Sequence, residues 1–311
     1  MMKSKVLILG SGPAGYTAGI YAARACLDPI LLTGSAKGGQ LTTTTDVENY
    51  TGFPNPVQGT WLMEQMEKHA QNVGVKIVED TATSVNLHTS PFEIVTEKKL
   101  QIHADTLIIA TGAVAKWLHL PSEDKFKGYG VSGCATCDGF FYRGREVAVV
   151  GGGNTALEEA LYLCNHASKV TIIHRRDTFR GDMTMQQRVL THPKINIIWN
   201  HVVNEVIGDD NPKSVTALNI KNVITGAIST LPIHGVFIAI GHKPNTDLFH
   251  GKIDLDSDGY IKTQAGTSIT SISGVFAAGD VQDKIYRQAI TSAGSGCIAA
   301  LDAERYLSKM P

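Results

Sequence analysis

The sequence has few of the features that mark a membrane, secreted or nucleic-acid-binding protein. No apolar run approaches the roughly 20 residues needed to span a bilayer. The five cysteines are odd in number and mostly scattered, unlike the disulfide framework of a secreted protein. The formal net charge is −1, so no electrostatic argument favours nucleic acid or an anionic membrane as a partner. Because the chain runs from Met1 straight into a strand pattern, without a signal peptide, we expect a cytoplasmic protein.

Glycine and aliphatic residues are abundant. Of the 311 residues, 31 are glycine, and hydrophobic residues make up 43%. This composition is typical of a soluble globular α/β protein with many tight turns. The length suggests two domains, each large enough to bury a core of its own.

A dinucleotide-binding pattern opens the chain. The aliphatic run at residues 5–9 predicts a buried parallel strand, and a helical pattern from Ala14 to about Cys26 leads to a second strand at 29–33. Between strand and helix stands Gly10-Ser-Gly-Pro-Ala-Gly15. Its glycines allow, in order, a tight turn, the approach of backbone to a pyrophosphate, and close helix–strand packing. The phosphates would lie at the helix N-terminus, where free N–H groups and the helix dipole favour anions.

One part of that pattern is missing. The second strand ends at Thr33-Gly-Ser-Ala36, without the acid that usually binds ribose, so another group must take that role. The Thr-rich loop at residues 37–46 could present hydroxyl and N–H groups to a polar ring or phosphate, or be a solvated surface loop. Beyond it the patterns predict a helix at 61–72, a strand at 75–80, an antiparallel meander at 81–105 and a buried strand at 106–112.

The same order of elements then recurs. A strand at residues 146–150 leads into Gly151-Gly-Gly153, a helix from about residue 154 to 165 and a strand at 169–173. Ala156, in place of the third glycine, is a permitted variant. Later, a strand at residues 235–241 echoes the one at 106–112. The repeat predicts a second dinucleotide-binding domain.

Basic residues end the second strand of this repeat. His174-Arg-Arg176, with Arg180 beyond, stands where an NAD-specific site would have an acid. Guanidinium groups there can bind a 2′-phosphate in a bidentate manner. A solvated basic turn is the alternative for any Arg pair, but the position in the repeat favours a site for NADPH over one for NADH.

The remaining residues, after Gly241, are expected to return to the first domain. They include a strand pattern at 274–280 that ends in an acid, and a helix from about residue 287 to 307. Small and apolar residues recur along that helix at a spacing that predicts one buried face, formed by Ile290, Ala293, Cys297 and Leu301.

The predicted fold is therefore α/β, with two Rossmann-like dinucleotide-binding domains. Each is expected to have three layers, a parallel central sheet and a small antiparallel meander. The first domain comprises residues 1–114 and 245–311, and the second, residues 115–244, is inserted into it.

A pair of thiols lies between the two glycine patterns. Cys134-Ala-Thr-Cys137 is followed directly by Asp138 and can close a disulfide or supply half of a zinc site. The other cysteines, Cys26, Cys164 and Cys297, fall in predicted apolar helices and are expected to be small core residues rather than further metal ligands. We expect no metal site and favour a redox role for the pair.

At this level of detail the chain closely resembles the low-molecular-weight, bacterial-type thioredoxin reductases. The resemblance covers nearly the full length, and the Cys-Ala-Thr-Cys-Asp sequence is its most specific part. It is carried by segments that occur in the expected order: 10–16, 38–45, 134–139, 151–156, 174–176, 276–280 and 286–290.

The resemblance implies FAD on the first domain, NADPH on the second, the disulfide of thioredoxin as substrate, and a homodimer. It implies hydrogen bonds from Asp280 to ribityl or ribose hydroxyls, and a helix N-terminus beside the flavin at residues 287–289. The expected FAD contacts are Gly10, Ser11, Gly12, Pro13, Ala14, Gly15, Gly39, Gln40, Leu41, Thr45, Asn49, Thr111, Gly112, Gly279, Asp280, Arg287, Gln288 and Ala289. The expected NADPH contacts are Gly152, Gly153, Asn154, Thr155, His174, Arg175, Arg176, Arg180, Ile240 and Gly241.

The catalytic residues implied are Cys134, Cys137 and Asp138. Electrons would pass from NADPH through FAD to the Cys134–Cys137 disulfide, with Cys137 beside the flavin, Cys134 attacking the substrate and Asp138 as acid/base. Because the thiols belong to the same domain as NADPH, both must reach one flavin in turn. We expect residues 115–244 to rotate as a rigid body between the half-reactions.

Related functions remain as alternatives. A flavoprotein that supplies electrons to a peroxidase would carry an extra N-terminal thioredoxin-like region, for which the position of Gly10 leaves no room. A ferredoxin–NADP reductase would lack the thiol pair, and a small-molecule dithiol oxidase would lack the Arg175-Arg176 site. A non-enzymatic redox sensor or nucleotide-binding protein is the alternative from another class.

Overall fold

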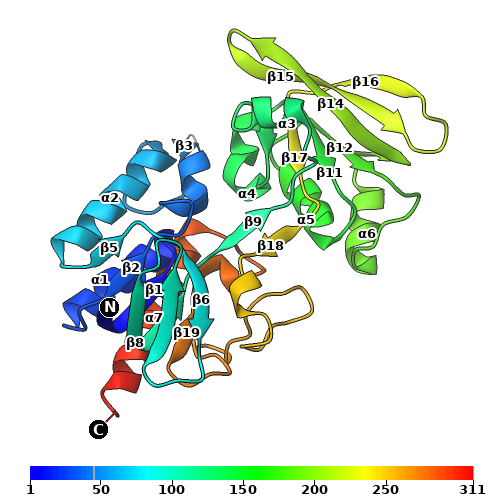
Figure 1. The fold of residues 1–311 in the computed structure, drawn as a ribbon. Helices are drawn as coiled ribbons and strands as arrows, with labels where there is room; N and C mark the ends of the chain where they lie inside the picture. Colours follow the sequence, from blue (N-terminus) through cyan, green and yellow to red (C-terminus); the bar gives the residue numbers. More distant parts are fainter. Residues whose placement is uncertain (45, 311) are drawn as a thin grey trace. The chain divides into compact units, whose positions relative to one another are not determined.

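The computed structural model describes residues 1–44 and 46–310. The chain forms two compact units. The first unit comprises Met1–Val114 and Lys243–Pro311, and the second unit comprises Ala115–His242. The chain thus leaves the first unit and re-enters it at Lys243, where the sequence suggested residue 245. Figure 1 shows both units, with the blue N-terminal and red C-terminal segments in the first.

The first unit is built on a seven-stranded sheet in the order β5-β2-β1-β8-β7-β6, with β19 also paired to β8. Its parallel strands are β1 (Met2–Leu9), β2 (Ile30–Leu32), β5 (Lys76–Val78), β8 (Gln101–Ile109) and β19 (Val275–Ala277). Two antiparallel strands, β6 (Ala82–Asn86) and β7 (Phe92–Thr96), complete it. Smaller elements are β3 (Asp46–Val47), β4 (Val57–Gln58) and the 3-10 turns Gly39–Thr43, Asp247–Phe249 and Gly279–Val281.

One strand serves both the meander and the parallel sheet. The sequence patterns predicted a meander at 81–105 and a separate strand at 106–112. The boundary between them was wrong, because β8 runs unbroken from Gln101 to Ile109. Its first half pairs antiparallel with β7, and its second half pairs parallel with β19. Local patterns show alternation or continuous burial, but they do not show that one strand changes partners along its length.

Alternate residues of β1 supply the cores on the two faces of this sheet. Val6 and Ile8 pack with the helices α1 (Pro13–Arg24), α2 (Gly59–Asn72) and α7 (Ala289–Leu307). Leu7 and Leu9 pack on the opposite face. Successive side chains of a strand point to opposite faces, so an unbroken apolar run requires cover on both sides.

Of the buried face expected on α7, Ala293 is confirmed, but the placement of Ile290 and Leu301 was wrong. Small residues such as Ala293, Gly296 and Ala300 face α1, while Ile290 and Leu301 are exposed. Gly296 lies so close to α1 that a Cβ would stand 2.2 Å from the Ala14 carbonyl oxygen. Two helices approach this closely only where side chains are small, so the larger apolar residues lie on the opposite side of α7.

The second unit repeats the plan with a five-stranded parallel sheet. Its order is β10 (Val131–Ser132), β17 (Gly235–Ile238), β11 (Glu146–Val150), β12 (Lys169–His174) and β13 (Ile195–Trp199). An antiparallel meander consists of β14 (His201–Asp210), β15 (Lys213–Asn222) and β16 (Ile228–Pro232). The helices are α3 (Pro121–Phe126), α4 (Ala135–Asp138), α5 (Asn154–Leu163) and α6 (Met183–Thr191), with a 3-10 turn at Gly139–Tyr142.

Alternate residues of strand β11 again belong to the hydrophobic cores on the two faces of the sheet. Val147 and Val149 pack on the side of α5, and Ala148 and Val150 pack on the side of the meander. The predicted α/β class, with parallel central sheets covered on both faces and small antiparallel meanders, is confirmed.

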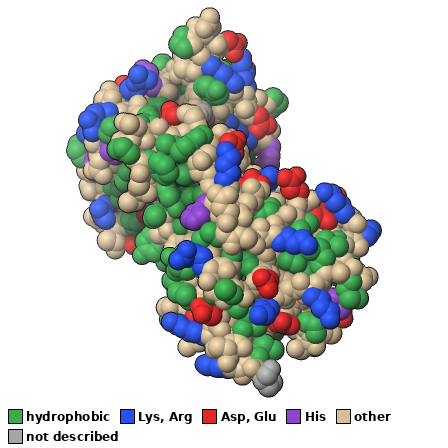
Figure 2. Space-filling view, turned by 90° about the vertical axis from the view of Figure 1, so that its left-hand side faces the viewer, with side chains coloured by type: hydrophobic (Ala, Val, Ile, Leu, Met, Phe, Trp, Pro, Cys, Tyr) green, Lys and Arg blue, Asp and Glu red, His purple; other side chains and the backbone are tan. Residues whose placement is uncertain are grey.

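The two connecting segments pair with each other. They form β9 (Ala113–Ala115) and β18 (His242–Pro244), a two-stranded ribbon. No helix in the described part of the chain is long and apolar enough to cross a membrane. On the face drawn in Figure 2, basic and acidic side chains are interspersed, as the formal net charge of −1 suggests.

A buried carboxylate ties α7 to the loop before β19, and this contact allows a test of the first unit. Asp302 accepts hydrogen bonds from the Ser268 N–H at 3.0 Å and the Ser268 hydroxyl at 2.8 Å. Asp302→Ala should lower the free energy of unfolding by about 2–3 kcal/mol, because both buried donors lose their acceptor. Asp302→Asn should cost less, and Glu304→Ala, an exposed acid on the same helix, less than about 0.5 kcal/mol. Urea denaturation measures all three, and equal losses in Asp302→Ala and Glu304→Ala would contradict the assignment.

Candidate functional site

In the first unit, several predicted cofactor contacts meet at one edge of the sheet. Strands β1, β8 and β19 are parallel, so their carboxyl ends lie side by side. Gly10 and Gly112 follow β1 and β8, and Gly279 follows β19. In open α/β sheets, ligands bind outside the carboxyl ends of the strands, which is where these glycines stand.

The first glycine turn is shaped by contacts that exclude side chains. Gly10 has φ +111°, and a Cβ there would lie 2.2 Å from the Ala110 carbonyl oxygen. A Cβ on Gly15 would lie 1.9 Å from the Gly10 carbonyl oxygen, so α1 packs directly on the turn. At Gly12, by contrast, an added Cβ would meet no atom within 4 Å. With Pro13 in its first turn and no side-chain cap, α1 presents backbone N–H groups toward this open position.

The loop after β2 lies against this turn. An added Cβ on Gly39 would approach Gly12 Cα to 3.3 Å. Ser11 is buried; its hydroxyl donates to the Thr33 carbonyl at 2.9 Å and accepts the Gly38 N–H at 2.9 Å. Its side chain therefore holds the loop in place, and only its backbone can face a ligand. Gln40 and Leu41 continue the loop in a 3-10 turn, while Thr45 lies outside the described residues.

Asp280 stands beside the start of α1. A Cβ on the preceding Gly279 would lie 2.9 Å from the Ala14 Cβ, which brings the two segments into contact. The Ser292 hydroxyl donates to Asp280 at 2.9 Å. Burial raises the pKa of Asp280 to about 6, while the bond from Ser292 opposes the rise. A carboxylate held in this way has acceptor capacity left for ligand hydroxyls.

Residues far apart in sequence meet near the beginning of α7. The Asn49 side chain donates to the Gln288 side chain at 3.2 Å. Gln288 also caps α7, whose first residue is Ala289, and Arg287 before it has φ +48°. Thr111 is held by Asn245, which accepts from its hydroxyl at 2.7 Å and donates to its carbonyl at 2.8 Å. No sequence pattern indicated this role for Asn245, because the two residues are brought together only by the return of the chain.

The second unit has an equivalent turn between β11 and α5. A Cβ on Gly151 would lie 2.4 Å from the Ala239 carbonyl oxygen, whereas one on Gly153 would meet nothing within 4 Å. Asn154 and Thr155 begin α5. Ile240 and Gly241 follow β17, the strand paired with β11, so they lie beyond the same edge of the sheet.

Three arginines extend beyond β12 next to this turn. Arg175, Arg176 and Arg180 are all exposed. Among residues 1–44 and 46–310, no carboxylate lies within ion-pair distance of their guanidinium groups. Their charge is therefore available to an anion. His174 differs from them, since its side chain is buried at the end of β12.

The two thiols form a disulfide on the second unit. Cys134 is bonded to Cys137, and Cys134 is the N-cap of α4, the short helix after β10. The Cys137 N–H donates to the Cys134 sulfur at 3.2 Å, and the Thr136 hydroxyl lies 3.4 Å from the same sulfur. Two polar groups thus surround one sulfur of the pair.

Asp138 ends α4 one residue beyond Cys137. Burial raises the pKa of Asp138 above its ordinary value, and a hydrogen bond from Ser132 opposes the rise. The Ser132 hydroxyl also accepts the Cys134 N–H at 3.0 Å. Ser132 therefore contacts both ends of the Cys-x-x-Cys-Asp segment, a role that sequence spacing did not reveal. A carboxyl with a raised pKa near two thiols is suited to holding or transferring a proton.

Comparison with known proteins places these features in a family. The model of the pyridine nucleotide-disulphide oxidoreductases matches residues 4–296. A thioredoxin reductase from Rickettsia felis is 60% identical over 306 residues, covering 98% of this chain and 99% of that protein. The chain belongs to the thioredoxin reductases of the pyridine nucleotide-disulphide oxidoreductase family.

Solved structures of this family share the fold. Thioredoxin reductase from Giardia duodenalis has a TM-score of 0.95 at 42% identity, covering 99% of this chain and all of that one. The Lactococcus lactis enzyme, described as the FR conformation, has a TM-score of 0.66 at 38% identity with the same coverage. The prediction of two dinucleotide-binding domains is confirmed.

FAD and NADPH are the cofactors of this family. The residues of this chain fit both groups. Each unit has a glycine turn with one open position at a helix N-terminus, at Gly12 and at Gly153, which suits a pyrophosphate. Only the second unit adds exposed arginines beyond its second strand, which suits a 2′-phosphate.

The remaining cysteines only partly match expectation. Cys164 is buried, as predicted. Cys26 is exposed and lies after α1 with φ +58°, so its expected place in an apolar helix core was wrong. Cys297 is half-buried on the outer side of α7. Hydrophobic pattern alone did not locate the end of α1.

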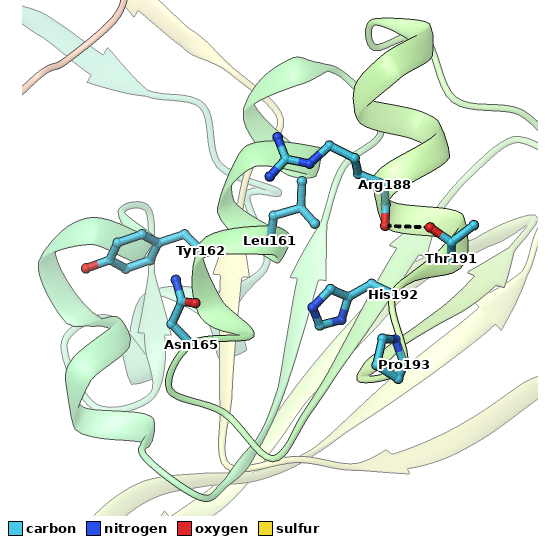
Figure 3. A pocket seen from close by; sticks show the side chains of 7 residues that line it. All are labelled: Leu161, Tyr162, Asn165, Arg188, Thr191, His192 and Pro193. Carbon is cyan, nitrogen blue, oxygen red and sulfur yellow. Dashed lines mark hydrogen bonds between the residues drawn. The ribbon is translucent and has the colours of Figure 1, made fainter.

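A separate surface pocket of about 530 Å³ lies on the second unit. Figure 3 shows its lining, from the ends of α5 and α6 and the turn that follows: Leu161, Tyr162, Asn165, Arg188, Thr191, His192 and Pro193. None of these is among the predicted cofactor or catalytic residues. The pocket is therefore distinct from the glycine turn and from the thiol pair.

Proposed function

We propose that this protein is an NADPH-dependent thioredoxin-disulfide reductase. The observation that carries the proposal is the Cys134–Cys137 disulfide, followed by the buried carboxyl of Asp138, on the unit that also holds the arginine-flanked glycine turn. Relatives at 60% identity carry the name thioredoxin reductase.

The cofactor contacts are proposed to be those predicted from sequence, with two changes. The first unit binds FAD through the turn at 10–15, the loop at 39–41, Thr45, Asn49, Thr111, Gly112, Gly279, Asp280 and residues 287–289. The second binds NADPH through the turn at 152–155, the three arginines, Ile240 and Gly241. The side chains of Ser11 and His174 are withdrawn as direct contacts, because both are buried in bonds within the protein.

The chemistry of the thiol pair follows from its surroundings. When bound, FAD supplies a two-electron carrier between nicotinamide and a disulfide. Once the pair is reduced, the Cys134 thiolate attacks a sulfur of the substrate disulfide, and a mixed disulfide forms. Cys137 then attacks the Cys134 sulfur, the Cys134–Cys137 bond is restored, and the substrate leaves as a dithiol. Asp138 holds the proton that a departing thiolate takes up.

The contacts at Cys134 support its role as the attacking thiol. The Cys137 N–H and the Thr136 hydroxyl lie 3.2 and 3.4 Å from its sulfur. Hydrogen bonds to the charged form of a group stabilise that form, so these donors favour a thiolate at Cys134.

A protein substrate is supported by two exposed aromatic side chains next to the thiols. Phe140 and Phe141 are 49% and 41% exposed, with ring centroids 6.4 Å apart. Their position three and four residues beyond Cys137 places apolar contact area close to the thiol pair in sequence. Aromatic residues dominate the energetics of protein interfaces.

Variants of the two thiols test the proposed reaction. Cys134→Ser and Cys137→Ser should each abolish NADPH-dependent reduction of a thioredoxin disulfide, because the relay needs both sulfurs. Anaerobic bleaching of the bound flavin by NADPH should survive in both, since it does not involve the thiols. Cys164→Ser, at a buried cysteine outside the site, is the control. Thioredoxin reduction that persists in both active-site variants would overturn the proposal.

We also propose a homodimer in the cytoplasm. The outer side of α7 carries Ile290, Ile298 and Leu301, which are 44%, 44% and 38% exposed, and Cys297 between them. Tyr21 of α1 adjoins this stripe, with a hydrogen bond to Cys297. These residues form an apolar strip that a second copy of the chain would cover. Recovery of the native protein from a periplasmic or secreted fraction would contradict the cytoplasmic location.

The strip can be disrupted without touching the sites. Ile298→Asp should convert the protein from a dimer to a species of 33.4 kDa, because burying an unpaired carboxylate in the interface is costly. Ile228→Asp, at an exposed isoleucine of the second unit, should leave the dimer intact. Sedimentation velocity distinguishes the two. A wild-type protein that sediments as a monomer at micromolar concentration would refute the dimer.

Rotation of the second unit between half-reactions is the last part of the proposal. Only the short segments 113–115 and 242–244 connect the units. The two solved relatives reported above differ little in identity, 42% and 38%, yet their TM-scores are 0.95 and 0.66. Such a drop over full coverage is what a different arrangement of rigid units produces.

Förster resonance energy transfer between labels on the two units tests this motion. Labels on non-natural amino acids at Glu93 and Asp209, exposed positions of the first and second unit, should give two transfer efficiencies in single molecules. Their populations should shift when NADPH is added under anaerobic conditions. A control pair at Glu93 and Lys68, both in the first unit, should give one constant value. A single unchanging efficiency for the first pair would argue against rotation.

A further inference from the structure

His174 lies among the arginine residues in sequence but not in space. Arg175, Arg176 and Arg180 are exposed, whereas His174 is only 5% exposed at the end of β12. A side chain that contacts a nucleotide phosphate must reach the surface of the site. The different burial therefore separates the role of the histidine from that of the arginines.

The imidazole closes the loop that carries the arginines. Its Nε2 lies 3.0 Å from the Thr178 carbonyl oxygen, and its ring packs against Phe179 at 5.7 Å between centroids. It also meets Trp199, its register partner on β13, at 6.1 Å, and the Phe179 and Trp199 rings lie 4.4 Å apart, so the three rings form one cluster. Residues 174–179 are thus held as a compact turn anchored to the sheet.

The same ring supports the glycine turn. A Cβ on Gly152 would lie 2.3 Å from His174 Cε1, so the imidazole occupies the space that a side chain would need. The Arg180 N–H donates to the Gly152 carbonyl at 2.8 Å. Further along, the Asp182 N–H donates to the Asn154 side chain at 2.6 Å. The arginine loop and the glycine turn are therefore fastened together at three points.

The histidine adds no charge to this cluster near neutral pH. Burial lowers the pKa of His174; the bond to Thr178 opposes this effect, and the charges of Arg176, Arg180 and Arg175 reinforce it. The neutral ring with its proton on Nε2 donates to Thr178. Positive charge for a 2′-phosphate comes from the arginines alone.

We propose that His174 is a positioning residue that holds the Arg175–Arg180 loop against the glycine turn and so sets the preference for a 2′-phosphorylated nucleotide. It does this without contacting the phosphate. The inference rests on the proposed use of NADPH and names the part of the chain that orients the arginines.

Calorimetric titration of the full chain with two nucleotides tests it without any turnover. The probes are adenosine 2′,5′-bisphosphate, which carries the 2′-phosphate, and adenosine 5′-monophosphate, which lacks it. His174→Phe keeps the ring but loses the donor; it should weaken bisphosphate binding about tenfold, within the range for residues coupled through one network. Binding of the monophosphate should change less than about twofold, because the arginines do not contact it. His174→Gln, which keeps an N–H near the Nε2 position, should restore most of the affinity.

A variant that lacks the three arginines separates a positioning role of His174 from direct contact with the phosphate. With Arg175, Arg176 and Arg180 all changed to Ala, His174→Phe should have no further effect on bisphosphate binding, since there is nothing left to position. An additive loss in that background would overturn the proposal. A second result would also overturn it: bisphosphate binding that strengthens more steeply at low pH in the wild type than in His174→Gln. Only a protonated His174 in direct contact with the phosphate would cause that difference.

The outcomes also separate this inference from the proposed function. If the wild type does not prefer the bisphosphate, the proposed use of NADPH fails, and the inference with it. If the wild type prefers the bisphosphate and His174→Phe binds it equally well, only the inference fails. Melting temperatures of each variant exclude loss of fold, and His174→Leu, which also lacks a donor for the Thr178 carbonyl, serves as the test if His174→Phe does not fold.

Discussion

The rest of the structure depends on the absence of a Cβ where a strand turns into a helix. At Gly15 a Cβ would lie 1.9 Å from the Gly10 carbonyl, and at Gly151 it would lie 2.4 Å from the Ala239 carbonyl. These contacts bring a helix N-terminus against the carboxyl ends of parallel strands. They leave Gly12 and Gly153 facing open space, where N–H groups can bind a phosphate. Both units are organised around this one close approach.

The two units differ in what surrounds that turn. In the first unit, Asp280 and the start of α7 approach it, because the C-terminal part of the chain returns through β19. In the second unit, the loop after β12 approaches it and carries exposed guanidinium groups. The same backbone geometry is thus paired with a buried carboxylate in one case and with exposed cations in the other.

The thiol pair is positioned by a short helix rather than by a glycine turn. A helix of four residues, α4, is too short to be stable alone and is held by β10 before it and by packing of Gly139 near Leu163 after it. This support holds the Cys134–Cys137 disulfide and the neighbouring Asp138 in place. The exposed Phe140 and Phe141 follow directly after α4, which places the apolar surface that we propose for a partner close to the thiols in sequence.

The sequence by itself determined the α/β class, the two glycine turns, the arginine cluster and the spacing of the thiols, because each depends on neighbours within about 20 residues. Only the tertiary structure decided that β8 changes partners, that the apolar strip of α7 faces outward, and that Asn245 and Ser132 support site residues. It also separated His174 from the arginines beside it. The physical reason is the same in each case: periodicity records which residues share a face, but the chain that covers that face comes from elsewhere in the sequence.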